Sequence, residues 1–482
     1  MRLERIGPNR WRLQGTKSGV AEAVVYLSPK LRQSLEEEEA LQQLAHAATL
    51  PGVVSPVVGM PDLHTGFGLP IGGVMATRIE DGIISAGAVG MDINCGVRLV
   101  TTGLLAREVP RAILEQLLAA ILKRVPTGIG KKSRHLDLRH GFLEEVALRG
   151  AAAMVAKGFG YQEDLNRIEE GGCLAGARLA AVSREAVARA DQLATLGGGN
   201  HFIELSVVDE VYAPETARAW GIMPGELTVL IHTGSRGFGH QICTDYSKLM
   251  QQAAKRYGIH LPTAGLACAP IGSAEGQDYL AAMACACNFA FANRQLITAD
   301  VREAFLEVLG PHRTLRDALG PRPLPLLYDV AHNIAKEEEH GGRCLLVHRK
   351  GATRALPPGH PANPQEYRQT GHPAIIPGSM GTASYVVVGT PATAETYHSV
   401  NHGAGRVLSR AAARKTISRE EFEQSMGDVL VTCPDYRQLL DEAPSAYKDV
   451  EEVVETLAAI GLTRKVLRLR PLAVIKGEGG EG

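Results

Sequence analysis

Apolar side chains recur at every third or fourth position in several segments of this chain, the spacing typical of amphipathic helices. This periodicity predicts helices over residues 110–124, 142–157, 173–195, 274–309 and 448–460. Another helix is expected from Pro29 to about Leu50, because Ser28-Pro29 is a typical helix start and Pro51-Gly52 a typical stop.

Short apolar runs bounded by glycine and proline predict strands elsewhere. Residues 228–232 and 326–330 have the pattern of buried strands, and residues 1–30, 53–102 and 344–400 should be rich in short strands. Helices and strands are interspersed and no internal repeat is visible, so the fold class is mixed α and β (α+β). Many of the predicted strands end in glycine-rich loops that contain polar side chains.

One such loop, Gly90-Met-Asp-Ile-Asn-Cys-Gly96, places Asp92 and Cys95 three residues apart. Both side chains can point into one space if the backbone turns, and the flanking glycines tolerate the positive φ that a turn requires. A carboxylate and a thiolate together form a metal-ligand pair that favours borderline or soft divalent ions. A single Asp-x-x-Cys is more often a buried structural cysteine beside a turn, so the metal hypothesis depends on further ligands.

Three histidines supply those ligands, since His201, His232 and His332 each lie beside glycines or at the end of a short apolar run. Together with Asp92 and Cys95 they are too many for one tetrahedral ion. The set therefore predicts two neighbouring metal ions bridged by the thiolate, an arrangement that suits phosphoryl chemistry.

Three more glycine-rich segments, 197–200, 377–384 and 402–406, resemble anion-binding turns with successive backbone N–H groups. In the last of them His402 opens a helix predicted to continue through Arg410, and a helix N-terminus favours phosphate. His402 is therefore either a phosphate-binding residue or a covalent nucleophile, and spacing alone does not separate the two roles.

The amino-acid composition narrows the classes of protein to which this chain can belong. Of the 482 residues 45% are apolar and 21% charged, as in ordinary globular proteins. A formal net charge of −1 excludes a basic field over the whole molecule, so a nucleic acid would have to bind a local patch. The eight cysteines form no Cys-x-x-Cys pair. The segment Met1–Gln14 lacks the apolar core of a signal peptide. The sequence contains no run of about 18 apolar residues, the length that a membrane-spanning helix needs. We therefore expect a reducing cytoplasmic setting, without disulfides or a membrane span.

The ordered motifs resemble those of the RtcB family of RNA-splicing ligases, from Met60-Pro-Asp to Ile475-Lys-Gly. The segments that carry the resemblance are Gly90-Met-Asp-Ile-Asn-Cys-Gly96, Leu196-Gly-Gly-Gly-Asn-His-Phe-Ile-Glu204, His232-Thr-Gly-Ser-Arg-Gly237, Asp329-Val-Ala-His-Asn333, Pro377-Gly-Ser-Met-Gly-Thr-Ala-Ser-Tyr385 and His402-Gly-Ala-Gly-Arg406. Two positions depart from the family pattern: Thr65 stands where an aromatic residue is expected, and Asn401 where a cysteine often precedes the nucleophile.

The resemblance implies a GTP- and Mn²⁺-dependent ligase that joins RNA 3′-phosphate or 2′,3′-cyclic phosphate ends to 5′-hydroxyl ends. It implies that Asp92, Cys95 and His201 hold one Mn²⁺, and that Cys95, His232 and His332 hold the other. His402 would attack GTP and carry GMP, which then passes to the RNA 3′-phosphate before the 5′-hydroxyl displaces it.

The implied guanylate pocket is formed by Asn200, His201, Phe202, Ile203, Glu204, His332, Asn333, Pro377, Gly378, Ser379, Met380, Ser384, Gly403, Ala404, Gly405 and Lys476. The residues of the whole implied site run from residue 62 to residue 476. If they meet in one site, the chain must form a single domain spanning 1–482 rather than the three domains that its length suggests. The partner is RNA, bound by a patch for which we propose Arg236, Arg349, Arg354 and Arg410. An archease-type activator is an additional candidate partner, and the oligomeric state is left open, with a monomer among the alternatives.

Two other functions compete with RNA ligation. A dinuclear metallophosphatase or phosphodiesterase would use the same five ligands with water as nucleophile, but it gives His402 and Lys476 no purpose. A non-catalytic, metal-stabilised RNA-binding protein would show no turnover and should have a more basic composition. Covalent attachment of GMP separates the ligase from both alternatives.

Overall fold

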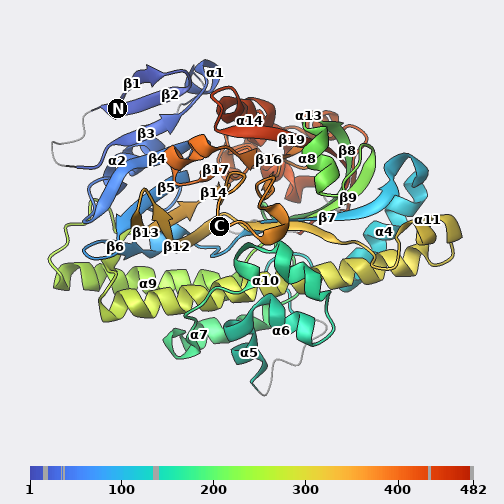
Figure 1. The fold of residues 1–482 in the computed structure, drawn as a ribbon, viewed down its shortest axis with the longest axis horizontal. Helices are drawn as coiled ribbons and strands as arrows, with labels where there is room; N and C mark the ends of the chain where they lie inside the picture. The colour runs from blue at the N-terminus through green and yellow to red at the C-terminus, as the bar shows by residue number, and fades with distance from the viewer. Residues whose placement is uncertain (15–19, 34, 36–37, 134–140, 433–435, 478–482) are drawn as a thin grey trace.

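Two large β-sheets lie side by side on one surface of a layer of long helices (Figure 1). The computed structural model describes residues 1–14, 20–33, 35, 38–133, 141–432 and 436–477. Helices α9 and α10 run beneath the sheets in this view, and α5, α6 and α7 lie on the far side of α10. The mixed α and β class predicted from the sequence is confirmed.

The first sheet is formed mainly by the N-terminal part of the chain. Its strands, in spatial order, are β1 (Arg2–Gly7), β2 (Arg10–Gln14), β3 (Ala23–Tyr26), β4 (Val53–His64), β5 (Ile71–Arg78), β13 (Arg343–Lys350) and β12 (Asn333–His340). All neighbours are antiparallel except β3 and β4, which are parallel.

The second sheet carries most of the predicted ligands at its strand ends. Its strands, in spatial order, are β11 (Leu326–Ala331), β7 (Gly96–Leu105), β9 (Glu226–Thr233), β8 (Phe202–Val211), β19 (Thr463–Lys476), β16 (Ser384–Gly389) and β15 (Ala374–Ile376). The short β18 (Leu430–Thr432) pairs in parallel with β19. Two small ladders complete the β-structure: β6 (Ile83–Ser85) with β10 (Cys268–Pro270), and β14 (Ala352–Arg354) with β17 (Ser399–Asn401).

The helices vary greatly in length. The α-helices are α1 (Pro29–Gln33), α2 (Glu38–Ala47), α3 (Ala86–Val89), α4 (Arg111–Arg124), α5 (Phe142–Arg149), α6 (Ala151–Ala156), α7 (Arg184–Val187), α8 (Pro214–Ala219), α9 (Arg236–Arg256), α10 (Ala274–Leu309), α11 (Arg313–Ala318), α12 (Arg410–Thr416), α13 (Arg419–Met426) and α14 (Val450–Ala458). The 3-10 helices are η1 (Ala106–Glu108), η2 (Gln162–Arg167), η3 (Glu169–Gly172), η4 (Leu179–Ala181), η5 (Ala190–Gln192), η6 (Ala264–Leu266), η7 (Gln365–Tyr367), η8 (Pro391–Thr396), η9 (Tyr436–Gln438), η10 (Leu440–Glu442) and η11 (Pro444–Ala446). None of the helices in the described part of the chain combines the length and apolar character needed to cross a bilayer.

Several predicted helices agree with these bounds and others are corrected. The helices predicted over 110–124, 274–309 and 448–460 are present as α4, α10 and α14. The helix predicted from Pro29 to Leu50 is present as α1 and α2, with residues 34, 36 and 37 outside the described residues. The helix predicted over 142–157 is broken at Gly150, whose φ of 53° and ψ of −131° are not helical.

The prediction of a helix over 173–195 is wrong, because that segment forms 3-10 turns and only the single-turn α7. Its backbone forms hydrogen bonds within short turns, such as that from Ala188 N–H to Arg184 O at 2.9 Å, and both ends of the segment are bonded to side chains of α10. Leu174 N–H donates to Asn288 Oδ1 at 2.6 Å, and Thr195 N–H donates to Asn293 Oδ1 at 3.1 Å. Tertiary hydrogen bonds therefore override the helix propensity of its alanines.

Helix α10 crosses the interior and is joined to the second sheet by a buried ion-pair network. Arg294 of α10 donates to both Asp329 oxygens at 3.0 Å, and Arg98 donates to Asp329 Oδ2 at 2.8 Å, with all three side chains fully buried. Arg294 Nη1 also donates to Asn94 O at 2.8 Å and to Thr233 O at 2.9 Å. One side chain of α10 thus holds the loop between Asp92 and Cys95 and the residue after His232.

The substitution Arg294→Met should destabilise the protein by about 3–5 kcal/mol, because removing one member of a buried ionic network leaves charge and carbonyl groups uncompensated. The free energy of unfolding, measured in urea, tests this. Arg178→Met is the matched control, since Arg178 pairs with Asp278 of the same helix but both side chains are about half exposed (53% and 52%). Arg178→Met should barely change the urea concentration at the midpoint of unfolding. Equal effects of the two substitutions would contradict the structural role of Arg294.

Candidate active site

The ends of five strands meet at one edge of the second sheet and bring distant segments together. β7 begins after Cys95, β8 begins after His201, β9 ends one residue beyond His232, β11 ends before His332, and β19 ends at Lys476. The pairing is in register, since Val97 and Phe202 both lie opposite His232 on either side of β9. Strand pairing therefore converts sequence separations of more than a hundred residues into side-chain contacts.

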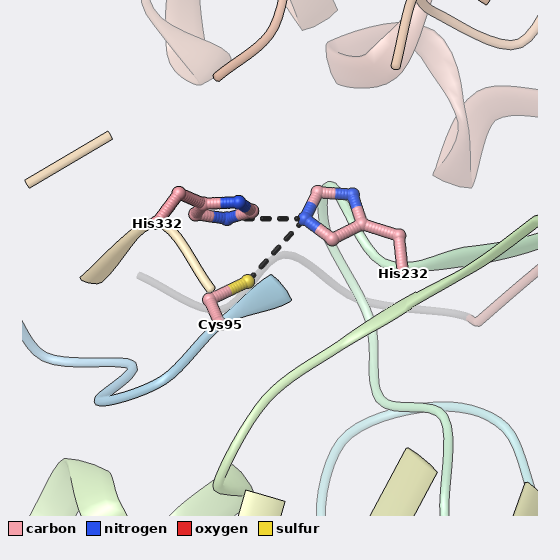
Figure 2. A group of neighbouring side chains, drawn as sticks. All are labelled: Cys95, His232 and His332. Carbon is pink, nitrogen blue, oxygen red and sulfur yellow. Dashed lines mark hydrogen bonds between the residues drawn. The ribbon is translucent and has the colours of Figure 1, made fainter. Parts of the chain in front are cut away.

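The five predicted ligands form two groups that share Cys95. In one group, Cys95 Sγ lies 3.3 Å from His232 Nε2, which lies 3.4 Å from His332 Nε2 (Figure 2). In the other, Cys95 Sγ lies 3.4 Å from His201 Nε2, which lies 2.9 Å from Asp92 Oδ2. These are the two groups implied by the family resemblance.

The spacing and chemistry of these atoms fit two divalent metal ions. Two ligands held about 2.1 Å from one ion at a tetrahedral angle are about 3.4 Å apart. The distances of Cys95 Sγ and of the two facing Nε2 atoms match this value. Burial lowers the pKa of His232 and of His332 well below the usual range, so both rings are neutral and offer lone pairs.

Local backbone geometry positions the Asp92 carboxylate. Asp92 O accepts from Cys95 N–H at 3.0 Å, and the intervening Asn94 has a left-handed φ of 54°. Asp92 Oδ1 accepts from Ser235 N–H at 3.0 Å. A Cβ at Gly234 would lie 2.4 Å from the carboxylate oxygens, so this position requires glycine. Burial raises the pKa of Asp92, but hydrogen bonding to His201 and Cys95 and the charges of His201 and Arg236 together hold that pKa below its usual value.

His402 lies next to the group formed by Cys95, His232 and His332, and it is held by Asp62. Its Nδ1 is 2.7 Å from Asp62 Oδ2, which also accepts from the backbone N–H of His402 at 2.9 Å and of Gly403 at 3.2 Å. The Asp62 side chain is fully buried, and the ring centroids of His402 and His332 are 4.9 Å apart. The His402 side chain is 14% exposed, so its ring is reachable from the cavity.

The helix predicted to begin at His402 is not present. Asn401 ends β17, residues 402–409 are irregular, and the next helix, α12, starts at Arg410. The backbone N–H groups of this turn are directed to the Asp62 carboxylate instead of into a helix, and Asn401 Nδ2 donates to Gly403 O at 3.2 Å. The anion-binding argument from a helix N-terminus is therefore withdrawn.

One cavity of about 740 Å³ joins the metal-ligand groups to most of the predicted nucleotide residues. The predicted residues that line it are Asn200, Phe202, His332, Asn333, Pro377, Gly378, Ser379, Met380, His402, Gly403, Ala404, Gly405 and Lys476. Ile203 packs in the hydrophobic core, and Ser384 accepts from Gly378 N–H at 3.0 Å, which braces the loop beneath the cavity.

Buried charges lie at the inner end of this cavity. Lys476 Nζ donates to Gly199 O at 2.7 Å and lies 3.5 Å from Glu442 Oε2, and burial lowers its pKa. Burial also raises the pKa of Glu204 to about 8, although Ser206 bonds to it, so this carboxyl is largely protonated at neutral pH. Glu204, although predicted for the guanylate pocket, is not among the residues that line the cavity, so of these two groups Lys476 is the one placed to donate to a bound nucleotide.

The basic patch predicted for RNA requires correction. Arg349 is fully buried against Glu338, and Arg354 is 7% exposed and paired with Glu169 and Glu170, so neither can reach an RNA phosphate. Arg236 and Arg410 do line the cavity, where Arg236 Nη1 lies 3.3 Å from His201 Nδ1.

The comparison with known proteins agrees with this geometry. Residues 43–477 match the family model described as tRNA-splicing ligase RtcB. The chain belongs to the RtcB family. A tRNA-splicing ligase RtcB of Archaeoglobus fulgidus is 46% identical over 98% of this chain and 99% of its own length. That of Thermococcus kodakarensis is 44% identical over 98% and 99%, and an RNA-splicing ligase RtcB of Mycobacterium tuberculosis is 46% identical over 90% and 100%.

Sequence reasoning gave no role to several residues that the RtcB-family structure places in this cavity or against His402. Asp62 lies in a motif that was recognised, but nothing in the sequence paired it with a residue 340 positions away. Lys350, Glu442 and Tyr447 also line the cavity. Lys350 ends β13 and lies inside the β-rich segment predicted over 344–400, whereas Glu442 and Tyr447 lie in short turns that carry no pattern.

Proposed function

We propose that this chain is a GTP- and Mn²⁺-dependent RNA ligase that joins RNA 3′-phosphate or 2′,3′-cyclic phosphate ends to 5′-hydroxyl ends. The observation that carries the proposal is the position of His402, bonded to a buried carboxylate and next to paired metal-ligand groups in one cavity. The names of the relatives, all RNA- or tRNA-splicing ligases, support the same reaction class.

The two metal ions would be held by Asp92, Cys95 and His201 and by Cys95, His232 and His332. Bound there, they would act as Lewis acids on phosphoryl oxygens. The rest of the chemistry falls to side chains of the chain itself, and one domain spanning residues 1–482 is proposed to supply them all.

His402 is the proposed nucleophile. Because Asp62 accepts a hydrogen bond at Nδ1, the neutral ring carries its proton there and its lone pair on Nε2. Nε2 would attack the α-phosphorus of GTP, forming a P–N bond as pyrophosphate leaves. Asp62 holds the ring in the attacking orientation and stabilises the positive charge that develops on it, in the manner of the carboxylate in other nucleophile–base arrangements.

Two transfers complete the reaction. An oxygen of the RNA 3′-phosphate attacks the guanylate phosphorus, and the P–N bond breaks to return the imidazole. The RNA 5′-hydroxyl then loses its proton and attacks the 3′-phosphorus, forming the phosphodiester and releasing GMP. Lys476 and the backbone of Ala404 and Gly405, which also line the cavity, would hold the nucleotide in line for these steps.

The proposed function is tested by intact-protein mass spectrometry after incubation with GTP and Mn²⁺. A covalent guanylate on the chain supports the ligase. A chain that stays unmodified but hydrolyses phosphate esters would instead support a dinuclear phosphatase.

Asp62→Asn should slow formation of the GMP adduct by about 100-fold or more, because an amide can donate to Nδ1 and so stabilise the wrong tautomer. Asp62→Glu should retain more activity than Asp62→Asn, since it keeps the acceptor charge although it shifts the ring. The measured quantity is the single-turnover rate of labelling with GTP, and retained metal content checks that the ligand groups are intact. Labelling by Asp62→Asn at the unmodified rate would contradict the assigned role.

A further inference from the structure

A second cavity, of about 1150 Å³, lies at the other end of the strands that lead into the candidate active site. Tyr328 of β11 and His340 of β12 line it, whereas His332 between these strands lines the first cavity. Arg354 of β14 and His398, directly before β17, line it too, and β17 leads to His402. None of the proposed metal ligands, the guanylate-pocket residues or His402 lines this second cavity.

Three imidazoles gather along one side of it. The ring centroid of His398 lies 4.9 Å from that of His360 and 5.4 Å from that of His340. The exposed carboxylates of Glu337 and Glu339 form part of the rim. Imidazoles next to carboxylates are the donor types that borderline divalent ions prefer.

The backbone holds His398 in an uncommon conformation, and its neighbours fix its tautomer. Tyr397 and His398 have consecutive left-handed φ values of 53° and 50°, which few residues other than glycine and asparagine adopt readily. The Thr393 hydroxyl donates to Thr390 O at 2.7 Å, so its oxygen accepts from His398 Nδ1–H at 2.9 Å. The lone pair of His398 is therefore on Nε2, as a metal ligand requires.

Three buried polar groups that line this cavity lack a hydrogen-bond partner among the residues that the structure describes. One is Arg354 Nε, which is ion-paired with Glu169 at 3.3 Å, and the other two are uncharged. Asn363 is 3% exposed and its Oδ1 is unpaired, and Tyr328 is fully buried with an unpaired hydroxyl. Unpaired buried polar groups cost about 1–3 kcal/mol each, so their presence beside a cavity indicates an occupant that contacts them. An unpaired carbonyl oxygen favours a cation or one of its bound waters.

The charge of the cavity wall also favours a cation. The buried cations on this side are already neutralised, Arg354 by Glu169 and Glu170 and Arg349 by Glu338. The rim carboxylates are therefore not offset by free positive charge, and an anion would be repelled.

We propose that this cavity is a second metal site, which takes a borderline divalent ion such as Zn²⁺ through the imidazoles of His398 and His360. His360 would rotate to present a lone pair, because its Nδ1 now accepts from Ala362 N–H in an exposed contact of 3.2 Å. A rim carboxylate and water would complete the coordination. The site is independent of the metal ions proposed for ligation and shares no ligand with them.

Zinc binding by the full chain tests the proposal in a Cys95→Ala background, which removes the ligand shared by the other two groups. His398→Asn is the informative variant: asparagine tolerates the left-handed backbone, and its amide can replace the bond to Thr393 while removing Nε2. His360→Gln removes the second ligand, and His312→Gln, an exposed imidazole outside the cavity, is the matched control.

Zn²⁺ retained after dialysis is measured by elemental analysis, and affinity by calorimetry. His398→Asn and His360→Gln should each lose one equivalent relative to the His312→Gln control, with affinity falling by about 100-fold or more. The test depends on the difference in zinc content between the variants, not on the total zinc content. Equal zinc content in all variants would overturn the proposal, as would inorganic phosphate, but not Zn²⁺, binding to this cavity. Unchanged unfolding midpoints show that a loss of zinc does not reflect unfolding.

Discussion

A chain carrying His402→Ala is expected to form no covalent adduct from GTP while it still binds metal ions. The substitution removes the only attacking atom proposed and leaves all five ligand side chains in place. Radiolabelled GTP followed by denaturing electrophoresis detects the adduct, which should be labile to acid and stable to base as a P–N bond. The expected loss of labelling is complete, within detection.

His240→Ala is the matched control, since His240 lines the same cavity but makes no contact with Asp62 that would orient it. It should label normally. Label that survives in His402→Ala would identify a different nucleophile and overturn the assignment.

The same variant separates the first chemical step from the last. Supplied with RNA that already carries guanylate on its 3′-phosphate, His402→Ala should recover joining to a 5′-hydroxyl strand, because that displacement does not use the imidazole. A phosphatase would show the opposite pattern, with no adduct in the unmodified chain and no joining of the activated RNA.

Cys95→Ala is expected to lose both metal ions, whereas His332→Ala should mainly weaken one. Cys95 is the only residue common to the two ligand groups, and its Sγ lies 3.3–3.4 Å from the nearest nitrogen in each. The thiolate is also the only soft ligand, so Zn²⁺ should compete well with Mn²⁺ at these groups.

The metal content of each variant after dialysis against Mn²⁺-free buffer tests this prediction. Cys268→Ala is the control, since Cys268 is a fully buried cysteine of β10 that belongs to neither group. Two full equivalents retained by Cys95→Ala would exclude a bridging thiolate, and equal losses in Cys95→Ala and His332→Ala would place the two ions differently.

The sequence allowed prediction of the elements whose pattern is set by local packing. α10 and α4 were placed closely, because their apolar spacing is long and regular and their ends carry ordinary signals such as Ser273, which caps α10 by accepting from Gly276 N–H at 3.1 Å. The five candidate ligands were recognised because glycine-rich turns at strand ends are rare settings for histidine and cysteine. Their grouping required the fold.

The failures have a common physical cause, which is competition from distant hydrogen-bond partners. Asp62 captures the backbone N–H groups of His402 and Gly403 and prevents a helix there. The burial of an arginine side chain likewise cannot be predicted from the sequence, because a guanidinium can lie either in solvent or in a buried ion pair. Arg349 and Arg354 are buried in such pairs, although both were proposed from the sequence as RNA contacts.

The position of Arg294 in α10 also bears on how the metal-binding loops open. Because it donates to both Asn94 O and Thr233 O while it pairs with Asp329, detaching either loop would leave buried hydrogen-bonding groups of α10 and the loop unpaired. We therefore expect the loops to open together with the core rather than separately from it. The order of the ligand side chains is established when the chain folds, so binding an ion requires little further loss of conformational entropy.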